Sequence, residues 1–141
     1  MTPYSQPRDV EWPKKLKGLS GKGFELWTTG GGCTAYGKEL DSGKKALLIT
    51  DTSGCGTPKQ MTRGQIIAGI DDYEAEGQYI ADAYFPNAKA FLDEIEKEGG
   101  GWSPSTVARA LLNGNTIRVG LRKQMDTLKG NKPYPKGCIF Q

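Results

Sequence analysis

The sequence of 141 residues contains no histidine. Without an imidazole, the chain cannot build a Ser-His-Asp or Cys-His nucleophilic site, a histidine general base or a histidine-rich metal site. Carboxylates remain, but Asp71 and Asp72 are adjacent on a predicted strand and would point to opposite faces of a sheet. We therefore expect a protein that is not an enzyme and that uses neither a cofactor nor a metal.

Cysteines and long apolar runs are also scarce. Cys33, Cys55 and Cys138 form an odd set with no C-x-x-C pair, which fits reduced thiols better than a disulfide framework or a metal site. No run of about 18 apolar residues could span a bilayer, and residues 1–15 lack the apolar core of a signal peptide. These absences predict a cytoplasmic protein without membrane association.

Glycine is abundant, with 20 residues, about double the usual share of about 7%. The length corresponds to about one domain with many turns. Residues 1–22 carry three prolines and several lysines without apolar periodicity, and they predict an extended basic N-terminal arm. Residues 23–141 would then form a single domain. The lysines of the predicted arm are Lys14, Lys15, Lys17 and Lys22.

Aromatic and β-branched residues predict strands in the first part of this domain. Residues 24–29 and 46–50 are such runs, and Asp41-Ser42-Gly43 between them is typical of a hairpin turn, because Gly43 can adopt a positive φ. Residues 66–73 and 78–85 predict two more strands around an EAEG turn, although the first segment also fits a short helix. We expect an antiparallel sheet of about four or five strands within residues 24–85.

Helix signals follow the strands. Asn87 is a typical N-cap for a helix over 87–98, and Ser103-Pro104 is a typical start for a helix over 104–113. The predicted fold class is therefore α+β, with the sheet packed against two or three C-terminal helices.

The third of these helices rests on an ambiguous pattern. Ile117, Leu121 and Met125 recur at helical spacing, whereas Ile117, Val119 and Leu121 alternate as in a strand. We favour a helix over 116–129, followed by a loop to the C-terminus.

Residues 32–39 (GCTAYGKE) come within one residue of the phosphate-binding pattern G-x-x-x-x-G-K-[ST]. Such a loop needs a helix after it, but a hairpin is predicted here, and Glu39 would repel phosphates. We therefore favour a bulge or a close backbone approach at these glycines. A small enzyme or ligand-binding domain that uses this loop is the alternative. Its site would comprise Gly31, Gly32, Cys33 and Lys38.

The net charge of +3 conceals two segments of opposite sign. Residues 70–100 contain nine acidic residues against two lysines, and residues 101–141 contain seven basic residues against one aspartate. In a first interpretation, the acidic, tyrosine-bearing stretch meets a basic partner such as a nucleic-acid-binding protein. Its residues would be Asp71, Asp72, Tyr73, Glu74, Glu76 and Asp82. The alternative is that the aromatic residues of this stretch line the core while its acidic residues make the exposed face soluble.

A second interpretation assigns binding to the basic segment. Two helices joined by a short Asn-Gly-Asn-Thr turn would resemble a helix-turn-helix that contacts a nucleic-acid backbone, although charge on exposed helix faces is also ordinary solvation. A third interpretation is that the acidic and basic segments attract each other within the fold or across the interface of a homo-oligomer. The basic residues in question are Arg109, Arg118, Arg122, Lys123 and Lys129.

The last four residues, CIFQ, match the prenylation pattern C-a-a-X, with lysines upstream. Prenylation at Cys138 would anchor the protein only inside a eukaryotic cell. An ordinary terminus with a short apolar end is the alternative, and we favour it.

The block LWTTGGGCTA at residues 26–35, continued by LLITD at 47–51, resembles a core found in small uncharacterised proteins of bacteria, prophages and plasmids. The resemblance covers about residues 24–52 and carries no catalytic residue over to this chain. It implies a phage or mobile-element setting, where small proteins often block host defence systems. We therefore expect a non-enzymatic binding protein that engages a host protein or nucleoprotein complex. More specifically, we expect an anti-CRISPR-like inhibitor of a defence complex that targets nucleic acid.

Overall fold

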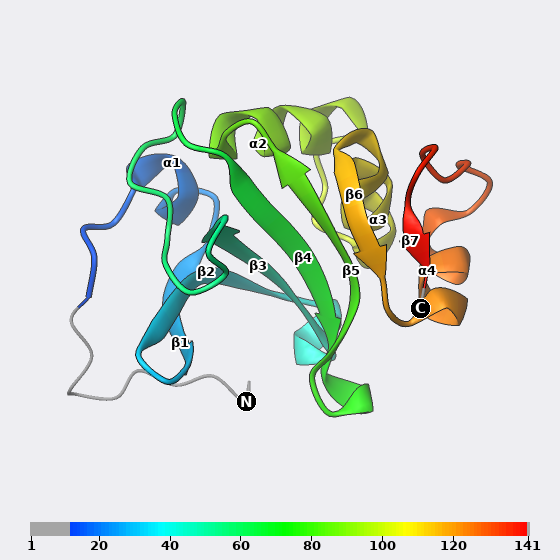
Figure 1. The fold of residues 1–141 in the computed structure, drawn as a ribbon, viewed down its shortest axis with the longest axis horizontal. Helices are drawn as coiled ribbons and strands as arrows, with labels where there is room; N and C mark the ends of the chain where they lie inside the picture. Colours follow the sequence, from blue (N-terminus) through cyan, green and yellow to red (C-terminus); the bar gives the residue numbers. More distant parts are fainter. Residues whose placement is uncertain (1–11, 141) are drawn as a thin grey trace.

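The computed structural model describes residues 12–140 (Figure 1). Its centre is a sheet of seven strands in the order β1 to β7, so that each strand pairs with the next one in the sequence. All pairs are antiparallel except the last, in which β7 runs parallel to β6. The strands are β1 (Glu25–Gly30), β2 (Cys33–Leu40), β3 (Lys45–Asp51), β4 (Ile66–Asp72), β5 (Gln78–Phe85), β6 (Asn115–Val119) and β7 (Ile139–Phe140).

The helices of the described residues pack on one side of this sheet. Each contributes a buried residue to a single apolar core: Leu19 from α1, Phe91 from α2, Val107 from α3 and Met125 from α4. Helix α3 contacts β4, β5 and β6 and lies behind β6 in Figure 1. The helices are α1 (Lys17–Ser20), α2 (Ala88–Lys97), α3 (Pro104–Asn113) and α4 (Arg122–Lys129). Two single 3-10 turns connect strands: η1 (Asp41–Gly43) joins β2 to β3, and η2 (Tyr73–Ala75) joins β4 to β5.

The strand register divides the side chains between two faces. The core face carries cross-strand neighbours such as Tyr36, Ile49 and Ala68, which belong to the apolar core. The opposite face, which we call the outer face, carries a second row of cross-strand neighbours, and none of them belongs to that core. From β1 to β6 this row is Glu25, Gly37, Leu48, Gly69, Asp82 and Arg118.

The α+β class predicted from the sequence is confirmed. The strands predicted over 66–73 and 78–85 are β4 and β5, and the helices predicted over 87–98 and 104–113 are α2 and α3. The hairpin turn also forms as expected, with Gly43 at φ +87°. The sheet is larger than predicted, because it also takes in β6 and β7 from the C-terminal third.

The helix predicted over 116–129 is wrong in its first half. Residues 115–119 form β6, which pairs with β5, and α4 begins only at Arg122. Gly120 lies between β6 and α4. A Cβ at this position would be 2.5 Å from the Tyr79 ring, and the Gly120 N–H donates to the Ile80 carbonyl at 2.9 Å. Glycine also disfavours a helix interior. Backbone pairing with β5 therefore outweighs the helical spacing of the apolar residues.

The predicted basic arm over 1–22 lies partly outside the described residues. Residues 12–22 pack against the domain, with one helical turn at α1 and a fully buried Leu19. The Tyr36 hydroxyl accepts a hydrogen bond from the Leu16 N–H at 2.8 Å and donates one to the Lys14 carbonyl at 3.4 Å. The segment that carries the lysines is therefore held in place as part of the fold.

The prediction of reduced thiols is wrong for two of the three cysteines. Cys33 and Cys55 form a disulfide, with their Cα atoms 4.4 Å apart. The register of β2 and β3 brings Cys33 beside the chain that leaves β3, and the Thr34 N–H donates to the Cys55 carbonyl at 2.8 Å. This pairing depends on how the loop after β3 folds back, which cysteine spacing does not encode. Cys138 is the free cysteine.

Candidate functional site

The outer face is the first candidate surface, because the described helices all place their buried residues on the opposite side of the sheet. It is lined in part by aromatic and apolar side chains that are half-buried: Leu48, Ile67, Tyr79 and Tyr84. Small residues lie between them. At Gly37 a Cβ would overlap the Trp27 indole, and at Gly69 a Cβ would lie 2.7 Å from Asp82 Oδ1.

An ion pair on this face joins the predicted acidic and basic segments. Arg118 Nε donates to Asp82 Oδ2 at 2.7 Å, and the Arg118 guanidinium carbon lies 4.1 Å from the centre of the Tyr79 ring. Burial raises the pKa of the Asp82 carboxyl above its ordinary value, and the hydrogen bond from Arg118 opposes that shift. Arg118 is therefore already occupied by an internal carboxylate.

A second set of ion pairs involves Glu98 at the end of α2. Lys132 Nζ lies 2.6 Å from Glu98 Oε1, Arg109 Nε lies 3.3 Å from Glu98 Oε2, and the Asn113 amide also donates to Glu98. The hydrogen bond from Lys132 is the largest cause that lowers the pKa of Glu98. Attraction between the two segments within the fold, the third interpretation of the charge pattern, is thus confirmed for Arg109, Arg118 and Lys132.

The predicted acidic residues do not form one surface. Asp72 is buried and faces α4, where it accepts hydrogen bonds from the Gln124 side chain and from the Glu74 N–H. Asp71 is also buried, opposite Ala46 of β3, and Tyr73 is half-buried. Glu74 and Glu76 are exposed in the turn between β4 and β5.

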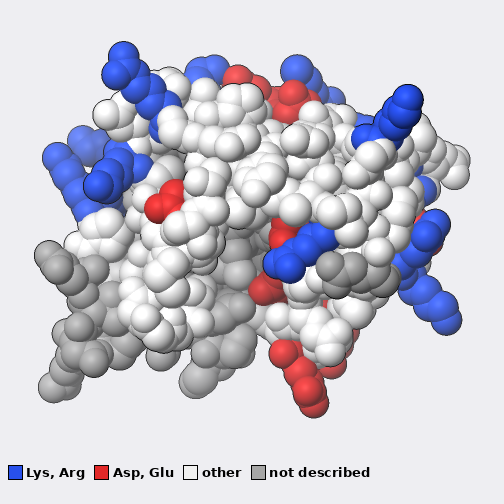
Figure 2. Space-filling model, viewed as in Figure 1, with Lys and Arg blue, Asp and Glu red and all other residues white. Residues whose placement is uncertain are grey.

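These two glutamates have acidic neighbours that the sequence did not indicate. The Tyr73 N–H donates to the Lys44 carbonyl at 2.9 Å and so joins the β4–β5 turn to the β2–β3 turn. We call this part of the molecule the acidic end, and Figure 2 shows acidic side chains gathered where β4 and β5 meet their turn. Lys44 is the exposed cation within it. The exposed carboxylates of the acidic end are Glu39, Asp41, Glu74 and Glu76.

The predicted basic residues are dispersed over several elements. Because β6 separates α3 from α4, the two helices do not form a helix-turn-helix, and Arg118 lies on a strand. On α4, Arg122 lies 3.7 Å from Asp126, and Lys129 lies 4.8 Å from the centre of the Tyr134 ring. Lys123 is exposed on the same helix.

The glycine loop does not assemble a site from its four predicted residues. Gly31 and Gly32 are exposed in the β1–β2 turn, and Cys33 is bonded to Cys55. The Lys38 ammonium donates to the Lys22 carbonyl at 2.9 Å and lies 5.1 Å from the centre of a Trp102 ring. As predicted, a hairpin and not a helix follows the glycines.

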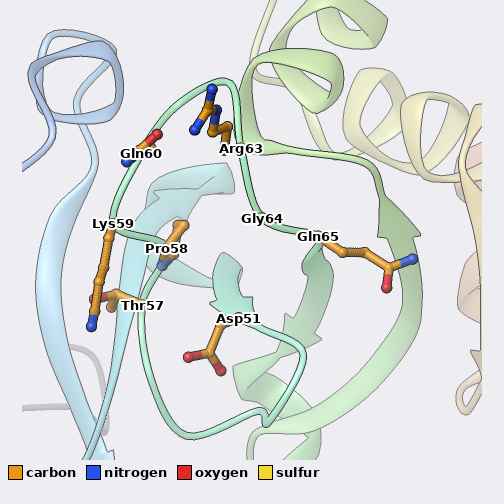
Figure 3. Close-up of a pocket in the computed structure, with 8 residues that line it drawn as sticks. All are labelled: Asp51, Thr57, Pro58, Lys59, Gln60, Arg63, Gly64 and Gln65. Carbon is orange, nitrogen blue, oxygen red and sulfur yellow. The ribbon is translucent and has the colours of Figure 1, made fainter.

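The sequence predicts no function for the loop between β3 and β4, yet this loop lines an open cavity of about 300 Å³ (Figure 3). A second cavity of about 330 Å³ is lined by some of the same residues and by Trp12. Thr57 and Pro58 are buried, whereas Lys59 and Arg63 are exposed. The residues that line the first cavity are Asp51, Thr57, Pro58, Lys59, Gln60, Arg63, Gly64 and Gln65.

The C-terminal segment is folded against the rest of the chain. β7 pairs with β6, and Phe140 packs on Tyr134 with ring centres 4.7 Å apart. Cys138 is half-buried, and this burial raises the pKa of its thiol. Prenylation of Cys138 would require this segment to leave the edge of the sheet.

Residues 12–140 lack two features that would indicate a particular class of protein. No group of three or more cysteine, aspartate or glutamate side chains there is arranged to hold a metal ion. No helix in the same range is long and apolar enough to cross a membrane. No protein-family model, curated protein or solved structure matches the chain.

Proposed function

We propose that this chain is a small, non-enzymatic binding protein that engages a positively charged host protein or nucleoprotein complex through its acidic end. The observation that carries the proposal is the convergence of four exposed carboxylates where two turns meet: Asp41, Glu74 and Glu76 in the turns and Glu39 at the end of β2. A cluster of this sign raises the rate of encounter with a basic partner and selects against acidic ones.

The outer face beside the acidic end supports the same proposal. Tyr79 is half-buried there, across from Asp71 of β4, whereas Tyr84 lies toward the other end of β5. Aromatic side chains with a polar tip supply much of the binding energy of protein interfaces. Carboxylates that steer the encounter and Tyr79 as an aromatic anchor would together form a contact surface for a protein with a basic patch.

The setting of the proposal comes from the resemblance of residues 26–35 and 47–51 to small prophage and plasmid proteins. A defence complex that acts on nucleic acid presents basic surfaces, and an acidic end would compete for them. We therefore propose inhibition of such a complex as the specific form of the function. Inhibition of such a complex requires a cytoplasmic protein, and this location is part of the proposal. The cysteines do not support it, because disulfides persist mainly in oxidising compartments.

The other two functions predicted from the sequence have less support. A nucleic-acid surface on the C-terminal helices would need Arg109 and Arg118, and both are engaged by internal carboxylates. A ligand site at the glycine loop would need a free Cys33.

The test is affinity purification of the tagged protein from nuclease-treated host lysate, with quantitative mass spectrometry of the partners. We expect Glu74→Lys/Glu76→Lys to lose most of the recovered partner. The matched control Asp93→Lys/Glu96→Lys reverses two exposed carboxylates on α2 and should retain it. Equal recovery with both double variants, or a monomer that recovers no stoichiometric partner, would contradict the proposal.

A further inference from the structure

Five exposed cations from two distant parts of the chain lie together at the opposite end of the molecule from the acidic end. They gather because α1 packs against the β3–β4 loop: a Cβ on Gly18 would lie 2.8 Å from the Met61 side chain. Figure 2 shows basic side chains over α1 and this loop. We call this group the basic surface, and its members are Lys14, Lys15, Lys17, Lys59 and Arg63.

No ion pair within residues 12–140 engages any of these five cations, as the described salt bridges involve other lysines and arginines. The carboxylate that lines the cavities beside them is Asp51. Its Oδ1 accepts hydrogen bonds from the Ser53 N–H at 3.0 Å and from the Ser53 hydroxyl at 2.5 Å. Within residues 12–140, no carboxylate therefore pairs with the cations of this surface, in contrast to Arg109 and Arg118.

The basic surface is also hollowed. Lys59 lines both cavities of the β3–β4 loop, and Arg63 lines the first. Figure 3 shows Lys59, Gln60 and Arg63 along the limb of the loop that leads away from Thr57. Their ammonium, amide and guanidinium groups are hydrogen-bond donors of the kind that contact phosphate oxygens.

We propose that the basic surface binds the phosphate backbone of nucleic acid without reading its sequence. Five exposed cations on one surface, of which Lys59 and Arg63 line a hollow, suit a chain of phosphates. A membrane surface fits less well, because interfacial binding also needs apolar side chains that insert into the lipid. The exposed large apolar residues within the described range are Ile139 and Phe140, on β7 at the far edge of the sheet.

The surface is held in place by contacts that do not involve its charges. The Met61 carbonyl accepts from the Lys89 N–H at 2.9 Å, and the Thr62 carbonyl accepts from the Asn87 amide at 3.2 Å. Asp51 N–H donates to the Gly56 carbonyl at 2.9 Å on the other limb. Neutral substitutions of the lysines should therefore leave the fold intact.

The experiment measures binding of a fluorescein-labelled DNA duplex by anisotropy between about 50 and 200 mM salt. For five phosphate contacts, the slope of log affinity against log salt should be about −4 to −5. The magnitude of this slope should fall by roughly 3 in the triple variant Lys14→Gln/Lys15→Gln/Lys17→Gln. It should fall by roughly 2 in the double variant Lys59→Gln/Arg63→Gln. The control Lys123→Gln/Lys136→Gln removes two exposed cations from α4 and the C-terminal segment and should leave the slope unchanged. Circular dichroism confirms that each variant is folded.

Three results would overturn the proposal: no binding at the lowest salt, an equal loss of slope in the control, or binding to vesicles rich in phosphatidylserine without binding to the duplex. The proposal is independent of the function proposed for the acidic end. Recovery of a partner from nuclease-treated lysate should be unaffected by the five substitutions, so the failure of one proposal is distinguishable from the failure of the other.

Discussion

Opening the Cys33–Cys55 disulfide should lower the free energy of unfolding by roughly 3 kcal/mol. The two cysteines are 22 positions apart, and closing a loop of this size restricts the unfolded chain by about that amount at 25 °C in the chain-entropy model. The perturbation is the double variant Cys33→Ser/Cys55→Ser, with the wild-type protein in a thiol reductant as a second route to the same state. Cys138→Ser is the matched control, since its thiol takes no part in the cross-link.

The effect can be measured by urea titration, followed through tryptophan fluorescence. With a slope of about 1–3 kcal/mol per molar urea, the midpoint should fall by about 1–3 M. The loss of stability should affect the β3–β4 loop first, because the disulfide and the hydrogen bond from Thr34 to Cys55 connect this loop to β2. Trypsin should therefore cleave after Lys59 and Arg63 faster in the reduced protein than in the oxidised one.

Two outcomes would refute this reasoning. Thiol titration of the unreduced protein in denaturant should find one reactive thiol per chain, from Cys138, and three after reduction. Three thiols before reduction would mean that the cross-link does not form. One thiol together with identical urea midpoints for oxidised and reduced protein would mean that the cross-link forms but does not stabilise the fold.

Two further predictions concern charge and packing. Glu98→Gln should cost roughly 1 kcal/mol through the lost charge-assisted hydrogen bonds from Lys132 and Arg109, against no change for the exposed Glu96→Gln. Because the pKa of Glu98 is lowered in the folded state, its stabilisation is complete above the ordinary value of 4.5 and is lost as the pH falls through the lowered pKa. Thermal melts at several pH values should show this acid-side loss in the wild type and a smaller one in Glu98→Gln. Gly37→Ala should destabilise by about 1–3 kcal/mol or more because its Cβ would overlap Trp27, whereas Gly101→Ala, with its nearest atom 4.0 Å away, should be tolerated. Equal melting temperatures for the two glycine variants would contradict the close approach.

The parts of the fold that follow local signals could be predicted from the sequence. Asn87 Oδ1 accepts from the Ala90 N–H at 2.7 Å, and Ser103 Oγ accepts from the Thr106 N–H at 3.1 Å, so both predicted helix starts carry the expected caps. The turn around Gly43 depends likewise on residues adjacent in sequence. Such signals need no knowledge of the rest of the chain.

The parts that sequence analysis missed all depend on distant partners. β6 exists because its backbone pairs with β5, and Arg118 meets Asp82 across 36 positions. The disulfide and the basic surface both depend on the path of the β3–β4 loop, which Met61 brings against Gly18. Counting charges by segment found the acidic and basic residues correctly but could not show which of them neutralise one another.

The two proposed surfaces should act independently, because they lie at opposite ends of β3. The acidic end adjoins Lys45, where β3 begins, and the basic surface adjoins Asp51, where it ends. Seven strand residues span about 20 Å, more than twice the Debye length of about 8 Å at physiological salt. The acidic end should therefore not repel a nucleic acid bound at the basic surface. If so, Glu74→Lys/Glu76→Lys should leave the salt slope for duplex binding unchanged, and one molecule could contact the protein and the nucleic acid of a single complex at the same time.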